Sequence, residues 1–369
     1  MKDALRIYGV ARNDSAGTYY RLSAPLSVLR YKTQHEIVIG PLTQDLLEYD
    51  VVVMQQMADP LSVMLAQKVQ QAGGVVIYDV DDYLFDLPPS WPSYDQWYVR
   101  GKGIPRDRLV FHEMLLRGAD LITCPTTPLA GRLIASLGLD ADKVHVLPNC
   151  VLMGDWDVLP STEHNLDGPV IGWFGSSNHW DEWFEIMDSV LQAVRKIKGY
   201  LVVAGMPEVM ALVPDKFISR VRVQPLTAMR NMGEIRALVK SFDVGLAWCT
   251  AKTEASRCRS PLKALQYGAC GVPIVASETV YGRLPGWEIE KRTRAATFKA
   301  HEFGITVPQD RGLGLTRAIV AAVEQRNEFL PRAERWQQEV WDTWSYELQV
   351  DRWLEVILEQ VAKKKEGYQ

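Results

Sequence analysis

Short apolar runs alternate with helix-forming stretches along most of this chain of 369 residues, and this alternation limits the fold more than any other feature. The run Val75–Tyr78 is apolar at every position, which is typical of a strand buried on both faces of a parallel sheet. Between most such runs lies a stretch long enough for one crossover helix. The pattern therefore predicts an α/β protein with doubly wound parallel sheets and helices on both faces.

The expected elements fall into two series. The first has strands at Leu5–Val10, Val51–Met54, Val75–Tyr78, Asp120–Thr123 and Val144–Leu147, and helices at Tyr19–Tyr31, Pro60–Ala72, Arg106–Arg117 and Thr127–Leu137. The second has strands at Val170–Phe174, Tyr200–Ala204, Val221–Val223, Val244–Ala247 and Val272–Ala276, and helices at Asp181–Ile197, Thr227–Lys240, Pro261–Tyr267 and Gly314–Arg326. Thr127 is the expected N-cap of its helix, with Pro128 at the first helical position.

Two series in a chain of this length predict two domains, because one domain per ~150 residues is usual. We place the first domain at residues 1–150 and the second at residues 169–330. Residues 151–168 have little periodicity and form the expected linker, and residues 331–369 form a C-terminal helical segment with a long helix at Trp344–Lys365. Parallel sheets bind ligands at the carboxyl ends of their strands, so the cleft between the domains is the expected site.

Charge and cysteine content narrow the functional classes. The chain has 41 lysine and arginine residues against 45 aspartate and glutamate residues, a net charge of −4, which disfavours a broad nucleic-acid-binding surface but leaves room for a local basic groove. Its five cysteines form no CxxC pair, so we expect no disulfide framework and no zinc site. No apolar run approaches the ~18 residues of a membrane span, and the amino terminus does not resemble a signal peptide. A cytoplasmic protein is expected.

A basic segment beyond the strand Val244–Ala247 is the strongest candidate for binding an anion. Ser260 suits an N-cap and Pro261 a first helical position, so we expect a helix amino terminus there. Arg259, Lys263 and Gln266 follow at spacings that share one helix face. Two cations at a helix amino terminus suit a phosphate or diphosphate; the alternative is a solvated basic helix face.

Two glycine-containing turns could complete such a site. The turn after Val170–Phe174 contains Gly175, Ser176, Asn178 and His179, and is similar to a phosphate-binding turn without the full GxGxxG pattern. The first turn of domain one contains Gly17, whose missing side chain permits close backbone approach. The turn with Gly175 could also be an ordinary tight turn. In the turn with Gly17, the neighbouring Tyr20 and Arg21 could equally be packing and surface residues.

Three carboxylates follow the strand Val75–Tyr78. Asp79, Asp81 and Asp82 could accept a proton, bind a cation or hold sugar hydroxyls, or they could only cap local structure. The segment Tyr83–Pro105 then interrupts the α/β rhythm with four prolines and several aromatic residues. Trp91, Tyr94 and Trp97 could stack on an acceptor or pack within the loop.

The chain resembles the two-domain nucleotide-sugar glycosyltransferases of the glycogen-synthase-like type, family four, from about residue 7 to residue 330. The resemblance is strongest over residues 243–277. The matching segments are AGTYYRLSAPLSVLR, GGVVIYDVDDYLFDLP, ADLITCPTTPLAGRL, VHVLPN, IGWFGSSNHWDEW, FDVGLAWC and RSPLKALQYGACGVPIVAS. The family has the glycosyltransferase B fold, in which two Rossmann-like domains face a cleft and the last helix crosses back to domain one.

The resemblance implies transfer of a sugar from a nucleotide diphosphate donor to an acceptor hydroxyl with retained anomeric configuration. It implies no catalytic metal and no cofactor besides the donor as co-substrate. The expected catalytic residues are Asp81 and Asp82, and the expected acceptor-binding residues are Trp91, Tyr94 and Trp97. The expected donor-binding residues are Gly17, Gly175, Ser176, Asn178, His179, Leu226, Arg257, Arg259, Ser260, Lys263 and Gln266.

Two departures from the family pattern bear on the donor. Where the family often has two glutamates seven residues apart, this chain has Cys258 and Gln266, and it lacks the arginine and lysine that often follow the first strand of domain two. The diphosphate charge would then fall mainly on Arg257, Arg259 and Lys263. We expect a saccharide or lipid-linked acceptor. The alternatives are transfer to hydroxymethylated DNA bases, a nucleotide-sugar epimerase, and an inactive sugar-nucleotide-binding module.

Overall fold

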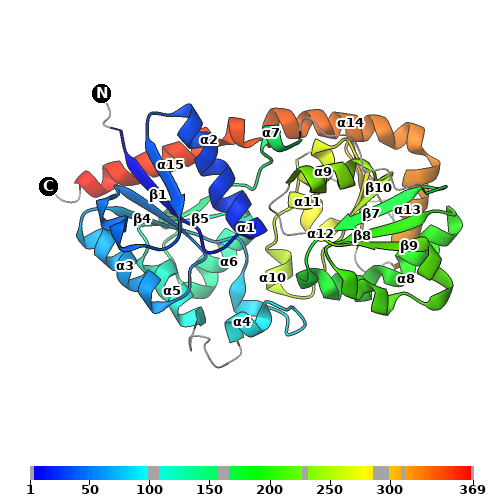
Figure 1. The fold of residues 1–369 in the computed structure, drawn as a ribbon, viewed down its shortest axis with the longest axis horizontal. Coiled ribbons are helices and arrows are strands. Elements are labelled where there is room, and N and C mark those ends of the chain that lie inside the picture. Colours follow the sequence, from blue (N-terminus) through cyan, green and yellow to red (C-terminus); the bar gives the residue numbers. More distant parts are fainter. Residues whose placement is uncertain are drawn as a thin grey trace.

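The computed structural model describes residues 4–98, 108–156, 166–226, 232–285, 299–308 and 312–366. It contains two parallel sheets side by side along the longest axis, each with helices on both faces (Figure 1). This is the predicted α/β class with two doubly wound sheets, and the prediction is confirmed.

The first sheet has six parallel strands in the order β2-β1-β3-β4-β5-β6. Its strands are β1 (Arg6–Val10), β2 (Glu36–Gly40), β3 (Val51–Gln55), β4 (Val75–Asp79), β5 (Leu121–Cys124) and β6 (Val144–Val146). Its helices are α1 (Ala16–Thr18), α2 (Ala24–Lys32), α3 (Pro60–Gln71), α4 (Tyr94–Tyr98), α5 (Arg108–Gly118) and α6 (Thr127–Leu137). The strand order reverses between β1 and β3, where such sheets bind ligands.

The second sheet has the order β12-β13-β11-β10-β7-β8-β9 and is parallel except for β12. Its strands are β7 (Val170–Phe174), β8 (Tyr200–Ala204), β9 (Val221–Gln224), β10 (Val244–Ala247), β11 (Ile274–Ser277), β12 (Lys299–Ala300) and β13 (Ile305–Val307). Its helices are α8 (Trp180–Lys196), α9 (Met232–Lys240), α10 (Glu254–Arg257), α11 (Leu262–Ala269), α12 (Glu278–Tyr281) and α13 (Gly312–Glu324). Here the order reverses between β7 and β10.

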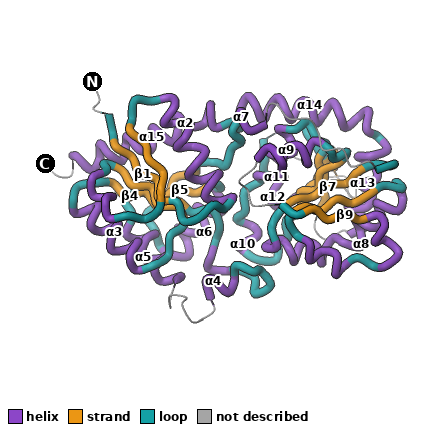
Figure 2. The backbone as a smooth tube through the Cα atoms, in the orientation of Figure 1, coloured by secondary structure: helices purple, strands orange, loops and turns teal. Residues whose placement is uncertain are grey.

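Two helices at the carboxyl end of the chain link the sheets, and the tube view shows them running along both (Figure 2). Helix α14 (Arg326–Thr343) packs on α11, where Trp336 Nε1 donates to the carbonyl of Ala264 at 2.8 Å. Helix α15 (Tyr346–Glu366) then packs on α2, and Lys364 Nζ donates to the carbonyl of Gly74 at 2.6 Å. The predicted return of the last helix to domain one is therefore confirmed.

Several local predictions were wrong. The expected helix Tyr19–Tyr31 is divided: α1 is followed by a π-helical turn at Tyr19–Ser23 and then by α2. Thr126 caps α6 in place of Thr127, because its hydroxyl accepts the backbone N–H of Leu129 at 3.2 Å. The sequence analysis missed the strands β2, β12 and β13, the short helices α4, α7 (Met153–Trp156), α10 and α12, and the longer helix α14.

Each miss has a physical reason. The strand β2 is only partly buried and β12 has only two residues, so neither shows a long apolar run. Helix α14 contains Pro331, a residue that usually ends a helix, so the sequence did not indicate a continuous helix across it. The proposed linker at residues 151–168 includes α7, and Val151 forms an isolated bridge with Ser345.

Candidate active site

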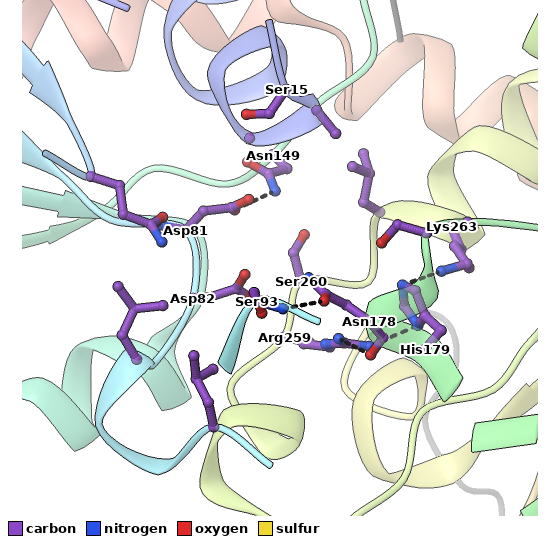
Figure 3. A pocket seen from close by; sticks show the side chains of 18 of the residues that line it. Ser15, Asp81, Asp82, Ser93, Asn149, Asn178, His179, Arg259, Ser260 and Lys263 are labelled. Carbon is purple, nitrogen blue, oxygen red and sulfur yellow. Dashed lines mark hydrogen bonds between the residues drawn. The ribbon is translucent and has the colours of Figure 1, made fainter. Parts of the chain in front are cut away.

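A cavity of about 580 Å³ lies between the two sheets, at the carboxyl ends of their strands. It is lined by the segments that follow β1, β3 and β4 on one side and β7 and β10 on the other, which includes the point of strand reversal in each sheet (Figure 3). The predicted location at the carboxyl ends therefore coincides with the cavity that the structure forms.

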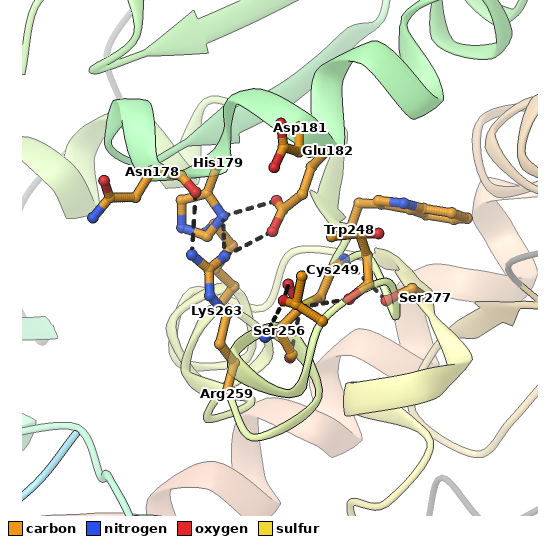
Figure 4. A network of polar contacts seen from close by, with 12 residues as sticks. Asn178, His179, Asp181, Glu182, Trp248, Cys249, Ser256, Arg259, Lys263 and Ser277 are labelled. Carbon is orange, nitrogen blue, oxygen red and sulfur yellow. Dashed lines mark hydrogen bonds and ion pairs between the residues drawn. The ribbon is translucent and has the colours of Figure 1, made fainter. Parts of the chain in front are cut away.

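Two cations and a histidine meet on the side of the second sheet (Figure 4). Lys263 Nζ lies 3.0 Å from His179 Nε2, and Arg259 Nη1 lies 2.8 Å from His179 Nδ1. Arg259 also donates to Glu182 Oε1 at 2.7 Å and to the carbonyl of Asn178 at 3.2 Å. Residues from the β7–α8 turn, from α8, from the loop before α11 and from α11 itself thus form one polar cluster at the edge of the cavity.

The imidazole of His179 lies between the two cations and a carboxylate. Its Nε2 atom faces the ammonium group of Lys263, which only donates. Its Nδ1 atom is 2.8 Å from Arg259 Nη1, which also only donates, and 2.8 Å from Glu182 Oε2. Burial, and then the charges of Lys263 and Arg259, lower the pKa of His179 well below its usual value, which keeps the ring neutral.

The electrostatic balance of this cluster favours an anion. Burial raises the pKa of Glu182 to about 7, and burial lowers the pKa of Lys263 to about 8. Near neutral pH the cluster therefore contains two cations and at most one carboxylate charge. Such an excess of positive charge beside a cavity suits an anionic group.

The turn after β7 brings its backbone close to the cluster. A Cβ atom at Gly175 would lie 2.7 Å from the Trp173 ring, so only glycine fits there without a shift. Gly175, Ser176, Asn178 and His179 all line the cavity, as the sequence analysis expected. Asn178 Oδ1 also accepts the backbone N–H of Ser93 from the first domain at 3.3 Å.

The start of α11 differs from the prediction. The helix begins at Leu262, Pro261 occupies the cap position, and no side chain caps the helix. Ser260 is therefore not the N-cap, although it lines the cavity. The helix does not extend back to Arg259, which reaches the cluster from the preceding loop.

Three expected donor-binding residues lie differently from Arg259 and Lys263. Arg257 pairs with Glu254 at 2.6 Å within α10 and does not line the cavity. Leu226 is partly buried against the core and does not line it either. Gln266 does line it, but its Nε2 donates to the hydroxyl of Tyr20 across the domain boundary at 2.7 Å.

The side of the first sheet presents carboxylates. Asp81 and Asp82 line the cavity, and a Cβ atom at Gly17 would lie 3.3 Å from Asp81 Oδ2. Burial, followed by the charge of Asp82, raises the pKa of Asp81 to about 7, and burial also raises the pKa of Asp82. Asp79 is different, because it is fully buried in an ion pair with Arg21 and does not reach the cavity.

The aromatic loop after β4 crosses to the second domain. Ser90 Oγ donates to Asp181 Oδ2 at 2.6 Å, and Asp86 Oδ2 accepts the backbone N–H of Glu254 at 2.8 Å. The ring of Trp91 lies under the Arg259 guanidinium, whose carbon is 4.2 Å from the ring centroid. The loop thus bridges the two sides of the site.

The predicted acceptor-stacking residues are packed in this structure. Trp91 is buried, and Tyr94 stacks on Tyr98 with ring centroids 4.5 Å apart. Trp97 lines the cavity but is also buried, beneath the guanidinium of Arg12. Trp91 and Tyr94 therefore pack within the loop, which was the alternative interpretation of these aromatic residues. Lys102, within this segment, and Arg106, just after it, lie outside the described residues.

The sequence analysis missed two residues of the site, Glu182 and Asn149. Glu182 lies on the buried face of α8, four residues before Ile186. A carboxylate on an apolar helix stripe requires a partner, and this signal could have identified it. Asn149 was noticed only as part of a matching segment, although it lines the cavity.

A second cavity of about 450 Å³ adjoins the first. The two share Asn149, Arg259 and Ser260 in their walls. Most of the other walls of the second cavity are apolar, with contributions from Pro125, Pro128, Pro148, Val280, Leu284 and Trp344. A polar cavity and an apolar cavity therefore meet beside Arg259.

Comparisons with known proteins identify the architecture. No family model and no curated protein sequence matches the chain. Among solved structures, it is similar to sucrose-phosphate synthase from Thermosynechococcus elongatus, with 13% identity, a TM-score of 0.64, and coverage of 97% of this chain and 100% of the other. HepE from Anabaena in complex with UDP and glucose gives 13% identity, a TM-score of 0.66, and coverage of 96% and 100%.

A third similar structure is the catalytic domain of starch synthase IV from Arabidopsis thaliana bound to ADP and acarbose, with 10% identity, a TM-score of 0.64, and coverage of 97% and 100%. Together these structures define the class of the fold: this chain has the two-domain B fold of glycosyltransferases. The fold that the resemblance implied is therefore confirmed.

Two features are absent from the described part of the chain. In it, no helix is both long and apolar enough to cross a membrane. Within the same residues, no group of three or more histidine, cysteine or acidic side chains is placed to hold a metal ion.

Proposed function

We propose that this protein is a glycosyltransferase that moves a sugar from a nucleotide diphosphate donor to an acceptor hydroxyl, with retained anomeric configuration and without a catalytic metal. The observation that carries the proposal is the arrangement of charge in one cavity. Arg259 and Lys263 meet at the point of strand reversal in the second sheet, and Asp81 and Asp82 line the opposite wall. The similar structures with bound UDP or ADP support a nucleotide diphosphate donor.

In this proposal the chemical task of the second domain is to stabilise the departing diphosphate. Arg259 and Lys263 supply fixed positive charge where negative charge develops, and they do so in a partly desolvated site where electrostatic interactions are strong. Gly175 lets the β7–α8 turn approach the phosphates closely. Ser176 and Ser260 offer hydroxyl groups beside the same space.

The first domain would act on the sugar and the acceptor. As the sugar bond breaks, positive charge develops on the anomeric carbon, and a carboxylate at Asp81 or Asp82 would stabilise it or orient the acceptor hydroxyl. With Asp81 near a pKa of about 7, its ionised form becomes dominant only above neutral pH. The transfer rate should therefore fall as the pH drops below about 7.

The apolar second cavity supports an acceptor with an apolar part. It adjoins the proposed reaction site but offers few hydrogen-bonding groups, which suits a lipid-linked or otherwise apolar saccharide acceptor better than duplex DNA. DNA binding would need several phosphate contacts from cations. Transfer to a modified DNA base remains the second candidate because Trp97 lines the first cavity.

The proposal is tested by incubating the protein with UDP-, ADP-, GDP- and dTDP-linked sugars and a panel of lipid-linked, saccharide and hydroxymethylated DNA acceptors. A glycosyltransferase forms a transfer product and releases nucleotide diphosphate. An epimerase returns an altered sugar nucleotide, whereas an inactive module raises the melting temperature without forming product. Either of the last two results, obtained with every donor, would overturn the proposal.

The carboxylates are tested separately. Asp81→Asn and Asp82→Asn should reduce the transfer rate while donor affinity changes little, because the charge is needed only at the reacting centre. If both variants keep the wild-type rate per folded molecule, the two carboxylates have only a structural role.

A further inference from the structure

Asn149 connects the interior of the first domain to the proposed catalytic carboxylate. It follows β6, has only 3% of its surface exposed, and lines both cavities. Its Nδ2 group donates to Asp81 Oδ1 at 3.3 Å (Figure 3), and its Oδ1 atom accepts from Arg21 Nη1 at 3.0 Å. One amide thus joins a buried arginine to a carboxylate in the site.

The orientation of this amide is fixed by its partners. The two ends of an asparagine amide are hard to distinguish by shape, and the hydrogen-bond network must decide between them. A guanidinium group only donates, so Arg21 requires the carbonyl end of Asn149. The N–H end is consequently directed at Asp81, where a carboxylate is the matching acceptor.

Arg21 itself has little freedom to move. Asp79 accepts from its Nε atom at 3.1 Å and from its Nη2 atom at 2.7 Å, and both side chains are fully buried. The carbonyl of Leu147 accepts from Nη1 at 2.5 Å. Asp79 is held in turn by the hydroxyl of Thr123 at 2.6 Å. Asn149 is therefore held in place by Arg21 from the π-helical turn, and Arg21 is held by groups at the ends of β4, β5 and β6.

Asp81 needs such a donor because its other charged neighbours largely oppose its ionisation. Asp82 follows it directly, and Asp79 lies two residues before it; both repel its charge, while Arg21 alone attracts it. From the facing elements, Gln56 accepts the backbone N–H of Asp81, and Gly17 offers no side chain. Across the cavity, Arg259 acts on Asp82.

We propose that Asn149 is a positioning residue, which holds the carboxylate of Asp81 toward the cavity in its ionised form and is itself oriented by the buried Arg21–Asp79 pair. The inference rests on the role proposed above for Asp81. The hydrogen bonds of Asn149 go to Arg21 and Asp81 and not to Arg259 or Lys263, so we expect its effect on the transfer step and not on donor binding.

The decisive variant is Asn149→Asp, which keeps an acceptor for Arg21 but removes the N–H donor to Asp81. A hydrogen bond to a charged group is worth enough that we expect a 10- to 150-fold lower kcat for transfer at pH 7. The acidic limb of the pH–rate profile should move to higher pH by about one to two units, because one pKa unit corresponds to a tenfold change in the interaction. Donor KM should stay unchanged.

Two controls separate positioning from a general loss of structure. In the Asp81→Asn background, adding Asn149→Asp should change kcat little, because the carboxylate that it serves is gone. Asn13 also lines the first cavity, but its side-chain oxygen accepts from the hydroxyl of Thr18 and not from Arg21, so Asn13→Ala should leave the acidic limb in place. An unmoved acidic limb in Asn149→Asp, or an equal loss in the Asp81→Asn background, would overturn the proposal.

A measurement that does not depend on enzyme activity can test the contact between Asn149 and Asp81 separately from the proposed function. The 13C carboxyl resonance of Asp81 can be identified by its absence in Asp81→Asn and titrated in the wild type and in Asn149→Ala. The midpoint should be higher in Asn149→Ala. An unchanged midpoint overturns the positioning role, whereas a raised midpoint in a protein that transfers no sugar would leave Asn149 coupled to Asp81 and overturn only the glycosyltransferase proposal.

Discussion

In the described part of the chain, two arginine–carboxylate pairs that are largely buried look alike and differ in what surrounds them. Arg21 and Asp79 lie 2.7 Å apart in the first domain, and both side chains are fully buried. Arg259 and Glu182 are also 2.7 Å apart, but the Arg259 side chain is 12% exposed and borders the cavity. The same bond length therefore occurs in two different settings.

The difference lies in where the remaining donors point. The Nε, Nη1 and Nη2 atoms of Arg21 all donate to acceptors within the protein. Arg21 therefore has no donor directed at a ligand. Arg259 is paired with a carboxylate whose pKa is raised by burial to about 7, and it lies beside a second cation, Lys263. We call Arg21–Asp79 the closed pair, because protein surrounds it completely and its contacts can serve only the fold. We call Arg259–Glu182 the open pair, because it borders the cavity and its positive charge can act on a ligand.

The largest effect should follow from breaking the closed pair. Arg21→Met leaves Asp79 buried without a counter-charge and should lower the free energy of unfolding by about 3–5 kcal/mol. Urea denaturation monitored by circular dichroism measures this loss. The double variant Arg21→Met with Asp79→Leu should recover much of it; equal stability of Arg21→Met and wild type would mean that the two pairs do not differ as described.

Breaking the open pair should affect the ligand more than the fold. Arg259→Ala or Lys263→Ala should weaken donor binding by about 10- to 150-fold, because each loses one charge-assisted contact to phosphate. The double variant should lose less than the product of the two, since both cations serve one diphosphate. Isothermal titration with the donor measures these changes.

Arg257→Ala is the matched control for this experiment. Arg257 lies two residues before Arg259 but pairs with Glu254 away from the cavity, so its loss should leave donor affinity unchanged. If Arg257→Ala weakens binding as much as Arg259→Ala, the charge acts at long range and the cluster is not the phosphate site.

A smaller effect should come from pH alone. Since burial lowers the pKa of Lys263 to about 8, the free protein loses this positive charge as the pH rises through 8, and donor affinity should fall severalfold between pH 7.5 and 9.5. Its folded-state pKa lies below the unfolded value of 10.5, so the same group should make the free protein more stable as the pH rises from about 8 to 10.5.

Lys263→Ala is the control for the pH effect. Its donor affinity should be low and should vary less with pH over this range. A pH dependence identical to that of the wild type would assign the titration to another group.

The smallest effect should come from the ring beneath Arg259. A cation–π contact is worth ~0.5–2 kcal/mol, so Trp91→Ala should weaken donor binding by about 2- to 30-fold through a less ordered Arg259. Tyr94→Ala is the control, because its ring stacks on Tyr98 in the same loop. Loss of acceptor transfer at unchanged donor affinity in Trp91→Ala would instead support the acceptor role predicted from the sequence.

The sequence predicted most strands of the fold because a strand buried on both faces, such as Val51–Gln55, needs an uninterrupted apolar run. It failed at β2 and β12, whose pairing depends on neighbouring strands and not on their own composition. The start of α11 was misplaced for a similar reason. The sequence shows a serine before a proline, but the tertiary structure decides which residue takes the cap conformation.

The candidate site was predicted in its location and only in part in its contacts. Lys263 and Arg259 were identified because cations beyond a strand end have few structural uses. Arg257 has the same chemistry, and only the structure shows that its partner is Glu254. Asn149 could not be assigned, because its role depends on Arg21, which is 128 residues away in the chain.

The π-helical turn at Tyr19–Ser23 makes this segment sensitive to the deletion of a single residue. Its wider winding lets three consecutive side chains, Tyr20, Arg21 and Leu22, all be buried, and it brings Tyr20 to Gln266 and Arg21 to Asp79. Deleting one residue here would restore ordinary helical winding and rotate one side of the segment by about 100° relative to the other. Both long-range contacts would then be lost together, so this segment should tolerate a change of residue type far better than a change of residue number.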